Sequence, residues 1–381
     1  MPAAVIVDVV RSPIGRAFKG SLASLRPDDA LAQVIDALLA RNEALDPALV
    51  QDVICGCGLP QGVQAFNVGR AGVLLSERLP ETTTGVTVSR FCASGLDAIR
   101  YASNAIAAGQ GDVMIAAGVE FVSSYSAQQE TANPQDRNPR MPSAYVEMGV
   151  TAEHVARRYG VSRAEQDEFA QRSQERAVAA QQSGAFAAEI VPLTLADGAS
   201  IAADDGPRPG SSLQGLARLR PAFDDAGTVT AGNSSPLNDG AAAALLMSAD
   251  RARALGLAPR ARIVSAATHG NDPALMGVAP IEAIAVALQR AGMTLRDIDL
   301  VELNEAFAAQ ALAVATASGI DHQKLNVHGG AIALGHPYGM TGVRIMATLL
   351  NAMAQRDATI GLETMCVAGG QGEAVIFERL A

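Results

Sequence analysis

The apolar and polar positions of the chain follow two periods in turn. Short apolar runs such as residues 4–10 predict buried strands, and longer segments with apolar residues three and four positions apart, such as 31–47, predict amphipathic helices. Strand, helix and strand follow in this order over residues 3–58 and again over residues 260–307. Strands that alternate with helices predict an α/β fold whose sheets are mostly parallel.

A second unit extends this repeat. In the first half, the strand predicted at 86–91 leads to a helix, and in the second half the segment 324–342 leads to another. In both helices the residues at i, i+3, i+7 and i+10 form one face: Leu96, Ile99, Ser103 and Ile106 in the first, and Val343, Met346, Leu350 and Met353 in the second. The repeat therefore predicts two similar α/β halves.

The segment between the two halves breaks the repeat. Residues 121–250 are richer in Pro, Gln, Arg and Asp, and they include one predicted helix over 151–180. We predict three regions: an N-terminal half at 1–120, a loop domain at 121–250 that ends in the last strand of that half, and a C-terminal half at 251–381. An insertion over one face of a fold is where a binding loop is expected, although an excursion that only stabilises the fold is the alternative.

Composition narrows the possible partners. The formal net charge of −10 opposes nucleic-acid binding, which requires a basic surface. Lysine occurs only at Lys19 and Lys324, so arginines or backbone amides would have to bind an anionic ligand. The longest apolar run, residues 241–247, is too short to cross a membrane. We therefore expect neither a nucleic acid nor a membrane as a partner.

The cysteines indicate a reducing compartment. Four cysteines in 381 residues are too few for a disulfide framework, and the N-terminus has no secretory or transit signal, so we expect a cytoplasmic location. Cys55 and Cys57 form a C-x-C pair, but no second pair of Cys or His at ligand spacing accompanies them. We expect these two to be small apolar strand residues, and we expect no metal site.

Cys92 and His336 precede equivalent helices of the repeat. The Cys92 sulfur would lie near the unpaired amides and the positive dipole end of its helix, which favour thiolate over thiol. His336 lies in the glycine-rich segment GGAIALGHPYGMTG, and a histidine is the natural base for a thiol at neutral pH. The internal symmetry would bring the two together. A buried structural cysteine and a turn histidine are the alternatives.

Cys366 and Asn304 are two further candidates. Cys366 lies in a predicted hairpin beside the glycine-rich turn 368–372, where a ligand could approach closely and amides could bind an oxyanion. Asn304 ends a predicted strand of the second half and could orient a water or a side chain. Taken singly, Cys366 could be a core residue and Asn304 a helix cap.

Taken together, these motifs resemble those of the thiolase family. SRFCASG is similar to the nucleophile motif of that family, LNEAFA to its Asn motif, GGAIALGHPYGMTG to its Gly-His-Pro motif, CVAGGQG to its C-terminal cysteine motif, and TAGNSSPLNDGAAA to a segment that passes near coenzyme A. The motifs stand in family order and cover the chain from end to end. The resemblance implies a duplicated thiolase fold, with five layers in the order αβαβα and an inserted loop domain.

The resemblance also implies a reaction and residue roles. It implies cleavage of a 3-ketoacyl-CoA by CoA, or the reverse Claisen condensation. His336 would deprotonate the Cys92 thiol, and Cys92 would then carry the acyl group as a thioester. Cys366 would be the second acid/base. His336 and a water oriented by Asn304 would hold the enolate oxygen, while the backbone N–H groups of Cys92 and Ala368 would hold the tetrahedral intermediate.

Further implications concern substrates and assembly. Arg208 and Ser235 match family residues near the adenine nucleotide and the pantetheine arm of CoA, and we place Met148 in the same binding region. The resemblance implies CoA and acyl-CoA as substrates, no tightly bound cofactor, and a homotetramer built as a dimer of dimers.

The sequence departs from the usual family pattern at several positions. Ala368 replaces a glycine, Tyr338 and Met340 replace smaller residues, and Glu147 stands where short-chain biosynthetic members have histidine. Phe91, directly before Cys92, is more typical of degradative members with a broader chain-length range.

Three alternatives to a degradative thiolase remain open at this point. Synthesis of acetoacetyl-CoA is the alternative within the family. A decarboxylating ketosynthase would pair one cysteine with two histidines, whereas this chain has Cys366 in place of a second histidine. A CoA-binding protein without activity is the third.

Overall fold

The computed structural model describes residues 2–125 and 137–380. The N-terminal half contains β1 (Ala4–Arg11), β2 (Gly15–Arg16), α1 (Pro27–Arg41), β3 (Asp52–Gly56), α2 (Val68–Leu75), β4 (Thr84–Val88), α3 (Ser94–Ala107) and β5 (Val113–Phe121). The excursion and its return contain α4 (Met148–Tyr159), α5 (Arg163–Ser183), β6 (Leu193–Thr194), β7 (Ser200–Ile201), α6 (Leu213–Ala217), β8 (Asn238–Ser248) and α7 (Ala249–Leu255). The C-terminal half contains β9 (Ala261–Gly270), α8 (Pro280–Ala291), β10 (Leu300–Leu303), α9 (Ala308–Ser318), α10 (Ala331–Leu334), α11 (Tyr338–Gln355), β11 (Ile360–Val367) and β12 (Gln371–Arg379).

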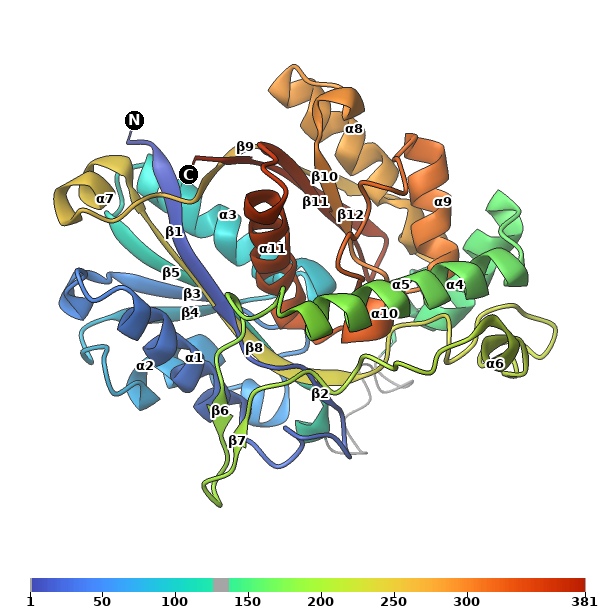
Figure 1. Cartoon of the computed structure of the whole chain (residues 1–381), viewed down its shortest axis with the longest axis horizontal. Coiled ribbons are helices and arrows are strands. Elements are labelled where there is room, and N and C mark those ends of the chain that lie inside the picture. Colours follow the sequence, from blue (N-terminus) through green and yellow to red (C-terminus); the bar gives the residue numbers. More distant parts are fainter. Residues whose placement is uncertain (1, 126–136, 381) are drawn as a thin grey trace.

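The elements form five layers in the order αβαβα, as the family resemblance implied. The long helices α3 and α11 lie between the two halves of the sheet, α1 and α2 cover the outer face of the first half, and α8 and α9 cover the outer face of the second (Figure 1). Each interface has its own apolar core: Leu96, Val343 and Met346 belong to the central one, Leu31 and Ile35 to one outer core, and Ile284 and Val314 to the other.

The two halves of the sheet repeat one strand order. The sheet order is β10-β11-β12-β9-β1-β8-β5-β3-β4, so β10-β11-β12-β9 corresponds to β3-β5-β8-β1. One antiparallel contact, between Ile6 of β1 and Ala261 of β9, joins the halves. The edge strand β4 has a reduced counterpart in the second half, a single parallel bridge between Val301 and Leu325. The predicted internal repeat is confirmed.

The expectation of mostly parallel sheets was wrong. β3 pairs in parallel with β4 and β5, and β10 with β11, but β8 is antiparallel to both β1 and β5. β12 is likewise antiparallel to both β11 and β9. The reason lies in the connections: β12 follows β11 through a tight turn, and β8 returns from the excursion to insert between β1 and β5. The hairpin of β11 and β12 was predicted, whereas sequence alternation alone does not reveal the return of β8 or the antiparallel pairing of β12 with β9.

The single helix predicted over 151–180 was also wrong. Gly160, in the left-handed region at φ 67°, ends α4, and Ser162 begins α5 through a capping box with Glu165. In the chain, α4 and α5 follow β5 of the N-terminal half. In space, they pack on α9 and α10 of the C-terminal half (Figure 1). The predicted loop domain therefore extends from the N-terminal half to the C-terminal half.

Two further observations concern membrane-spanning helices and metal ligands. Among residues 2–125 and 137–380, no helix is long and apolar enough to cross a membrane. Within the same residues, no three His, Cys, Asp or Glu side chains gather as metal ligands. Cys55 and Cys57 lie fully buried on and directly after β3, where they belong to the apolar core beneath α1.

Candidate active site

Cys92 lies in a short 3-10 turn, Phe91–Ala93, between β4 and α3. Phe91 takes a positive φ of 45°, a conformation that is strained for an aromatic residue, and its side chain remains 39% exposed. The Ser94 hydroxyl donates to the Phe91 carbonyl and accepts from the Arg90 N–H at 2.9 Å, which holds the turn closed. This turn presents the Cys92 sulfur ahead of the first turn of α3.

The resting thiol of Cys92 is neutral. Burial raises its pKa to about 12, the backbone N–H groups of Ala368 and Cys92 oppose this rise, and the negative charge of Glu120 adds to it. Contrary to the sequence-based expectation of a thiolate, burial favours the thiol, because desolvation outweighs the hydrogen bonds from these two N–H groups. Formation of a nucleophile requires a base that takes the proton as the reaction proceeds.

The hydrogen bonds of His336 hold it in a form that can accept a proton. It is 2% exposed, and its Nδ1 lies 2.7 Å from the Thr341 hydroxyl, which itself donates to the Pro337 carbonyl. Because that hydroxyl's proton is already used, Nδ1 must donate, and the lone pair is on Nε2. Burial, and next the charge of Arg344, lower the pKa of His336 to about 3. The imidazole is neutral at physiological pH.

Asn304 directly follows β10, as predicted, and contacts His336. Its Nδ2 lies 3.2 Å from His336 Nε2 and donates to that nitrogen. Asn304 is 1% exposed, and its Oδ1 is buried without a protein partner. A buried amide oxygen next to a basic nitrogen can hold a water or a substrate group by a hydrogen bond.

The predicted hairpin carries Cys366 and Ala368 to the same place. β11 and β12 pair in antiparallel fashion up to Val367 and Gln371, and Gly369 and Gly370 make the turn at φ 79° and 77°. Ala368 does not take a positive φ, so its methyl group causes no backbone strain. Cys366 is fully buried, and burial together with the adjacent Cys92 raises the pKa of its thiol.

The residues expected near CoA divide into two groups. Met148 lies with Phe223, Met276 and Phe307 in one apolar cluster that includes Cys366. The Ser235 N–H donates to the Ala306 carbonyl at 3.0 Å, which places Ser235 beside the segment of Asn304.

Arg208, the third residue expected near CoA, lies further out and lines a cavity of about 200 Å³ against α5. Its charge lies close enough to that of Arg16 for the two to interact.

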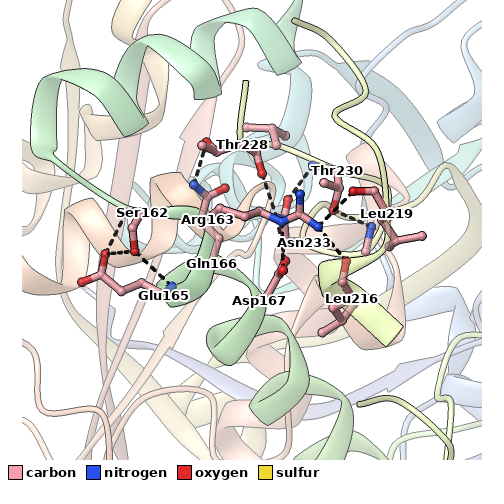
Figure 2. Close-up of polar contacts among 12 residues, drawn as sticks. Ser162, Arg163, Glu165, Gln166, Asp167, Leu216, Leu219, Thr228, Thr230 and Asn233 are labelled. Atoms are coloured by element: carbon pink, nitrogen blue, oxygen red, sulfur yellow. Dashed lines mark hydrogen bonds and ion pairs between the residues drawn. The ribbon is translucent and has the colours of Figure 1, made fainter. Parts of the chain in front are cut away.

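A buried polar network holds the segment that leads to Ser235 (Figure 2). Asn233 accepts from the Thr230 N–H at 2.7 Å and donates to Asp167 at 3.0 Å, while Gln166 donates to the Thr228 hydroxyl at 2.9 Å. Arg163 Nε bonds Asp167 at 2.8 Å. The start of α5 thereby fixes the loop of residues 228–235, which the sequence motif alone could not indicate.

Sequence reasoning missed two residues of this region. Tyr338 was noted only as a departure from the family pattern, yet its ring meets the His336 ring edge to face, with centroids 5.1 Å apart. Glu120, at the end of β5, was not considered at all, yet its carboxylate is fully buried near Cys92. An acidic residue in the otherwise apolar run 113–121 was the available signal. Met340, in contrast, is buried in the central core, and Glu147 is exposed.

Fold and site together define a class of enzyme. In a duplicated five-layer α/β fold, Cys92 is approached by two amides and lies close to Cys366 and to Tyr338. The Tyr338 ring in turn meets the neutral, buried ring of His336. This combination is suited to acyl transfer through a thioester.

Comparison with known proteins specifies the family. A model described as thiolase, N-terminal domain, matches residues 4–250, and one described as thiolase, C-terminal domain, matches residues 257–379. A 3-ketoacyl-CoA thiolase of Hahella chejuensis is 47% identical over 99% of this chain and 98% of its own length. One of Shewanella denitrificans is 47% identical over the full length of both chains. The crystal structure of a Bacillus anthracis acetyl-CoA acetyltransferase has a TM-score of 0.93 at 38% identity and covers 100% of this chain and 99% of its own.

The chain belongs to the thiolase family, and it is an acyltransferase. The family predicted from the motifs is thereby confirmed, and the match favours a thiolase over a decarboxylating ketosynthase. The predicted domain boundaries stay a prediction.

Proposed function

We propose that this protein cleaves 3-ketoacyl-CoA with CoA, yielding acetyl-CoA and an acyl-CoA shortened by two carbons, as a step of fatty-acid degradation. The names of its relatives support this substrate class. The observation that carries the chemistry is the hydrogen bonding of His336, whose Nδ1 donates to Thr341 and leaves a neutral Nε2 able to accept a proton. Because the thiol and the imidazole are both neutral at rest, the proton moves between them only as the sulfur attacks the substrate.

In the first half-reaction, His336 Nε2 takes the proton of Cys92 as its sulfur attacks the 3-keto carbon. The resulting oxyanion is held by the N–H groups of Cys92 and Ala368, which already point at the sulfur. Collapse of this intermediate breaks the bond between C2 and C3 and leaves the acyl group on Cys92. Loss of one such amide donor would cost about 3 kcal/mol of transition-state stabilisation.

The electron pair of the broken bond passes to acetyl-CoA as an enolate. His336, and a water held by Asn304, stabilise its oxygen, and the Cys366 thiol donates the proton that completes acetyl-CoA. Burial, which keeps the Cys366 thiol protonated, supports its role as an acid. In the second half-reaction, CoA loses its thiol proton to the Cys366 thiolate and attacks the thioester. Cys92 leaves and recovers its own proton from His336.

Coenzyme A and its acyl esters bind as substrates, and we propose no tightly bound cofactor. Ser235 and Met148 contact the pantetheine arm, and Arg208 contacts a phosphate of the nucleotide. The position of Met148 in the apolar cluster around Cys366 supports a path for that arm to the two thiols.

Condensation of two acetyl-CoA molecules is a second candidate. The structural similarity to an acetyl-CoA acetyltransferase favours it, and the residues would act in the reverse order. Thiolysis assays with 3-ketoacyl-CoA of four to sixteen carbons would separate the two, because activity confined to acetoacetyl-CoA would contradict the degradative assignment.

We further propose a cytoplasmic homotetramer built from two dimers. All four cysteines are free thiols, which fits a reducing compartment. β4 lies at the edge of the sheet with Val86 40% exposed, and an open edge of this kind can pair with a second copy. Light scattering on the purified protein would measure the assembly directly.

Mass measurement of the peptide containing Cys92 is the main test of the function. Incubation with acetoacetyl-CoA should add one acetyl group to Cys92, and addition of CoA should remove it. The variant Cys366→Ala should still accept an acetyl group from acetyl-CoA but should lose carbon–carbon cleavage. A wild-type chain without the adduct would indicate a CoA-binding protein that lacks activity.

A further inference from the structure

Glu120 is a fully buried carboxylate that the proposed mechanism does not use. It lies near the end of β5, and donors from six residues point at it. Oε2 accepts from the N–H groups of Gly58 at 2.7 Å and Gly339 at 2.8 Å. Oε1 accepts from the Leu59 N–H at 3.3 Å, the Gln64 side-chain amide at 3.1 Å, the Tyr125 hydroxyl and, more weakly, the Cys57 thiol at 3.8 Å.

These donors come from both halves of the molecule. Gly58 and Leu59 follow β3, and the Ser89 hydroxyl, which precedes the turn of Cys92, donates to the Gly58 carbonyl at 3.0 Å. Gly339 lies in the first turn of α11, three residues after His336. One carboxylate oxygen thus joins the loop next to Cys92 to the loop that carries His336.

The contact is tightly packed. A Cβ atom added to Gly58 would lie 2.7 Å from both Glu120 Oε2 and Tyr338 Cβ, and 3.1 Å from the Phe91 carbonyl. A Cβ atom added to Gly339 would lie 2.3 Å from the Val119 carbonyl. The two loops therefore pack closely around the carboxylate, and little room is left for either N–H group to shift away from Oε2 without loss of these contacts.

The hydrogen-bond donors around Glu120 require a carboxylate at this position. Every polar group that faces it in these contacts donates a hydrogen, and an ionised carboxylate can accept them all. A glutamine would turn an NH₂ group towards one of these donors and leave it unpaired. Burial raises the pKa of Glu120, and the hydrogen bonds from Tyr125, Gly339, Gly58 and Gln64 oppose that rise.

We propose that Glu120 is a positioning residue, whose ionised carboxylate fixes the distance between Cys92 and His336 by binding the loop beside each of them. The proposal rests on the proposed function, because it assumes that His336 takes the proton of Cys92. Glu120 has no hydrogen bond to the Cys92 sulfur or to the His336 imidazole, so it acts through the two loops.

The test is the single-turnover acylation of Cys92 by acetoacetyl-CoA in Glu120→Gln. We expect the rate to fall about 100-fold, because a displacement of about 1 Å between reacting groups has an effect of this size. The dissociation constant for CoA should stay within about twofold, since the CoA segment is held by α5 and not by Glu120. Loss of rate without loss of CoA affinity is a result that general destabilisation would not produce.

Glu189→Gln is the matched control. Glu189 is also fully buried, and it joins the other end of α11 to β1, accepting from Thr348 at 3.1 Å, Asn351 at 3.0 Å and Arg11 at 2.7 Å. Its replacement should lower the melting temperature but leave the acylation rate of the folded protein unchanged. Tyr125→Phe, which removes one donor and no link between the halves, should lower the rate less than tenfold.

Wild-type acylation is measured first, which separates the two hypotheses. A wild-type chain that is not acylated contradicts the proposed function. A folded Glu120→Gln with the wild-type rate, or an equal loss of rate in Glu189→Gln, overturns the role of Glu120. If Glu120→Gln does not fold, Glu120→Asp keeps the charge on a shorter arm that cannot reach both loops. An acylation rate in Glu120→Asp equal to that of the wild type would then overturn the proposal.

Discussion

The turns before α3 and α11 hold equivalent places in the two halves, yet they provide opposite environments. Cys92 lies in a partly exposed turn behind a strained Phe91 and is approached by amide donors. His336 is buried between a hydroxyl that accepts from it and an amide that donates to it, from Thr341 and Asn304. The duplicated topology brings the two turns together, while the local sequence decides which chemistry each one carries.

The comparison also explains how both groups stay neutral at rest. Burial favours the uncharged form of any group, so it raises the pKa of the Cys92 thiol to about 12 and lowers that of the His336 imidazole to about 3. A stable ion pair between them is therefore disfavoured. Proton transfer becomes favourable only when the substrate carbonyl accepts the sulfur and the amides accept the oxyanion.

Of the changes to Cys92 and His336, removal of the Cys92 thiol should lower turnover most. Cys92→Ser should lower turnover by at least about 10⁴-fold, because a serine hydroxyl is a much weaker nucleophile beside the same base. The variant should fold and bind CoA as the wild type does. Steady-state thiolysis and calorimetric CoA titration would check both, and near-wild-type turnover would exclude Cys92 as the nucleophile.

Removal of the base should have the next largest effect. His336→Gln keeps a polar side chain of similar reach but accepts no proton, so the acylation rate should fall about 10³-fold. Reaction of Cys92 with iodoacetamide at pH 7.5 reports the same loss without substrate. An unchanged alkylation rate would mean that another group activates the thiol.

A change to Thr341, which holds the His336 ring, should slow acylation less than a change to His336 itself. Thr341→Val removes the acceptor of the Nδ1 proton and leaves a buried N–H unpaired, which should slow acylation about tenfold. Nitrogen NMR of the histidine ring should show a second tautomer. Thr348→Val, on the same helix and also buried, is the control. Equal effects of the two changes would indicate lost packing and not a lost tautomer.

The last effect concerns the stability of the folded protein at different pH values and leaves turnover aside. The depressed pKa of His336 means that the unfolded chain binds a proton below about pH 6.5, whereas the folded chain does so only near pH 3. Its contribution to stability is present above pH 6.5 and is lost as pH falls towards 3, at up to about 1.4 kcal/mol per pH unit. Urea titrations between pH 4.5 and 7 should show a shallower slope for His336→Gln, and parallel slopes would contradict the assigned pKa.

Much of this protein could be predicted from its sequence. Apolar periodicity predicted the helices that became α3 and α11, the repeat predicted two similar halves, and the hairpin around Cys366 formed as expected. These features depend on neighbours a few positions apart, whose contacts follow from the backbone period. The errors concerned long-range pairings, namely β8 between β1 and β5 and the antiparallel pairing of β12 with β9. They also concerned the break at Gly160, where the capping signal was present in the sequence.

By itself, the sequence determined the class of fold, the family and the candidate residues, because motif order and periodicity are properties of the chain. Only the tertiary structure decided the state of those residues. The pKa of Cys92, the tautomer of His336 and the position of Glu120 between two loops depend on groups far apart in the sequence. Desolvation and hydrogen bonding act between whatever atoms the fold brings into contact, and local sequence does not specify those atoms.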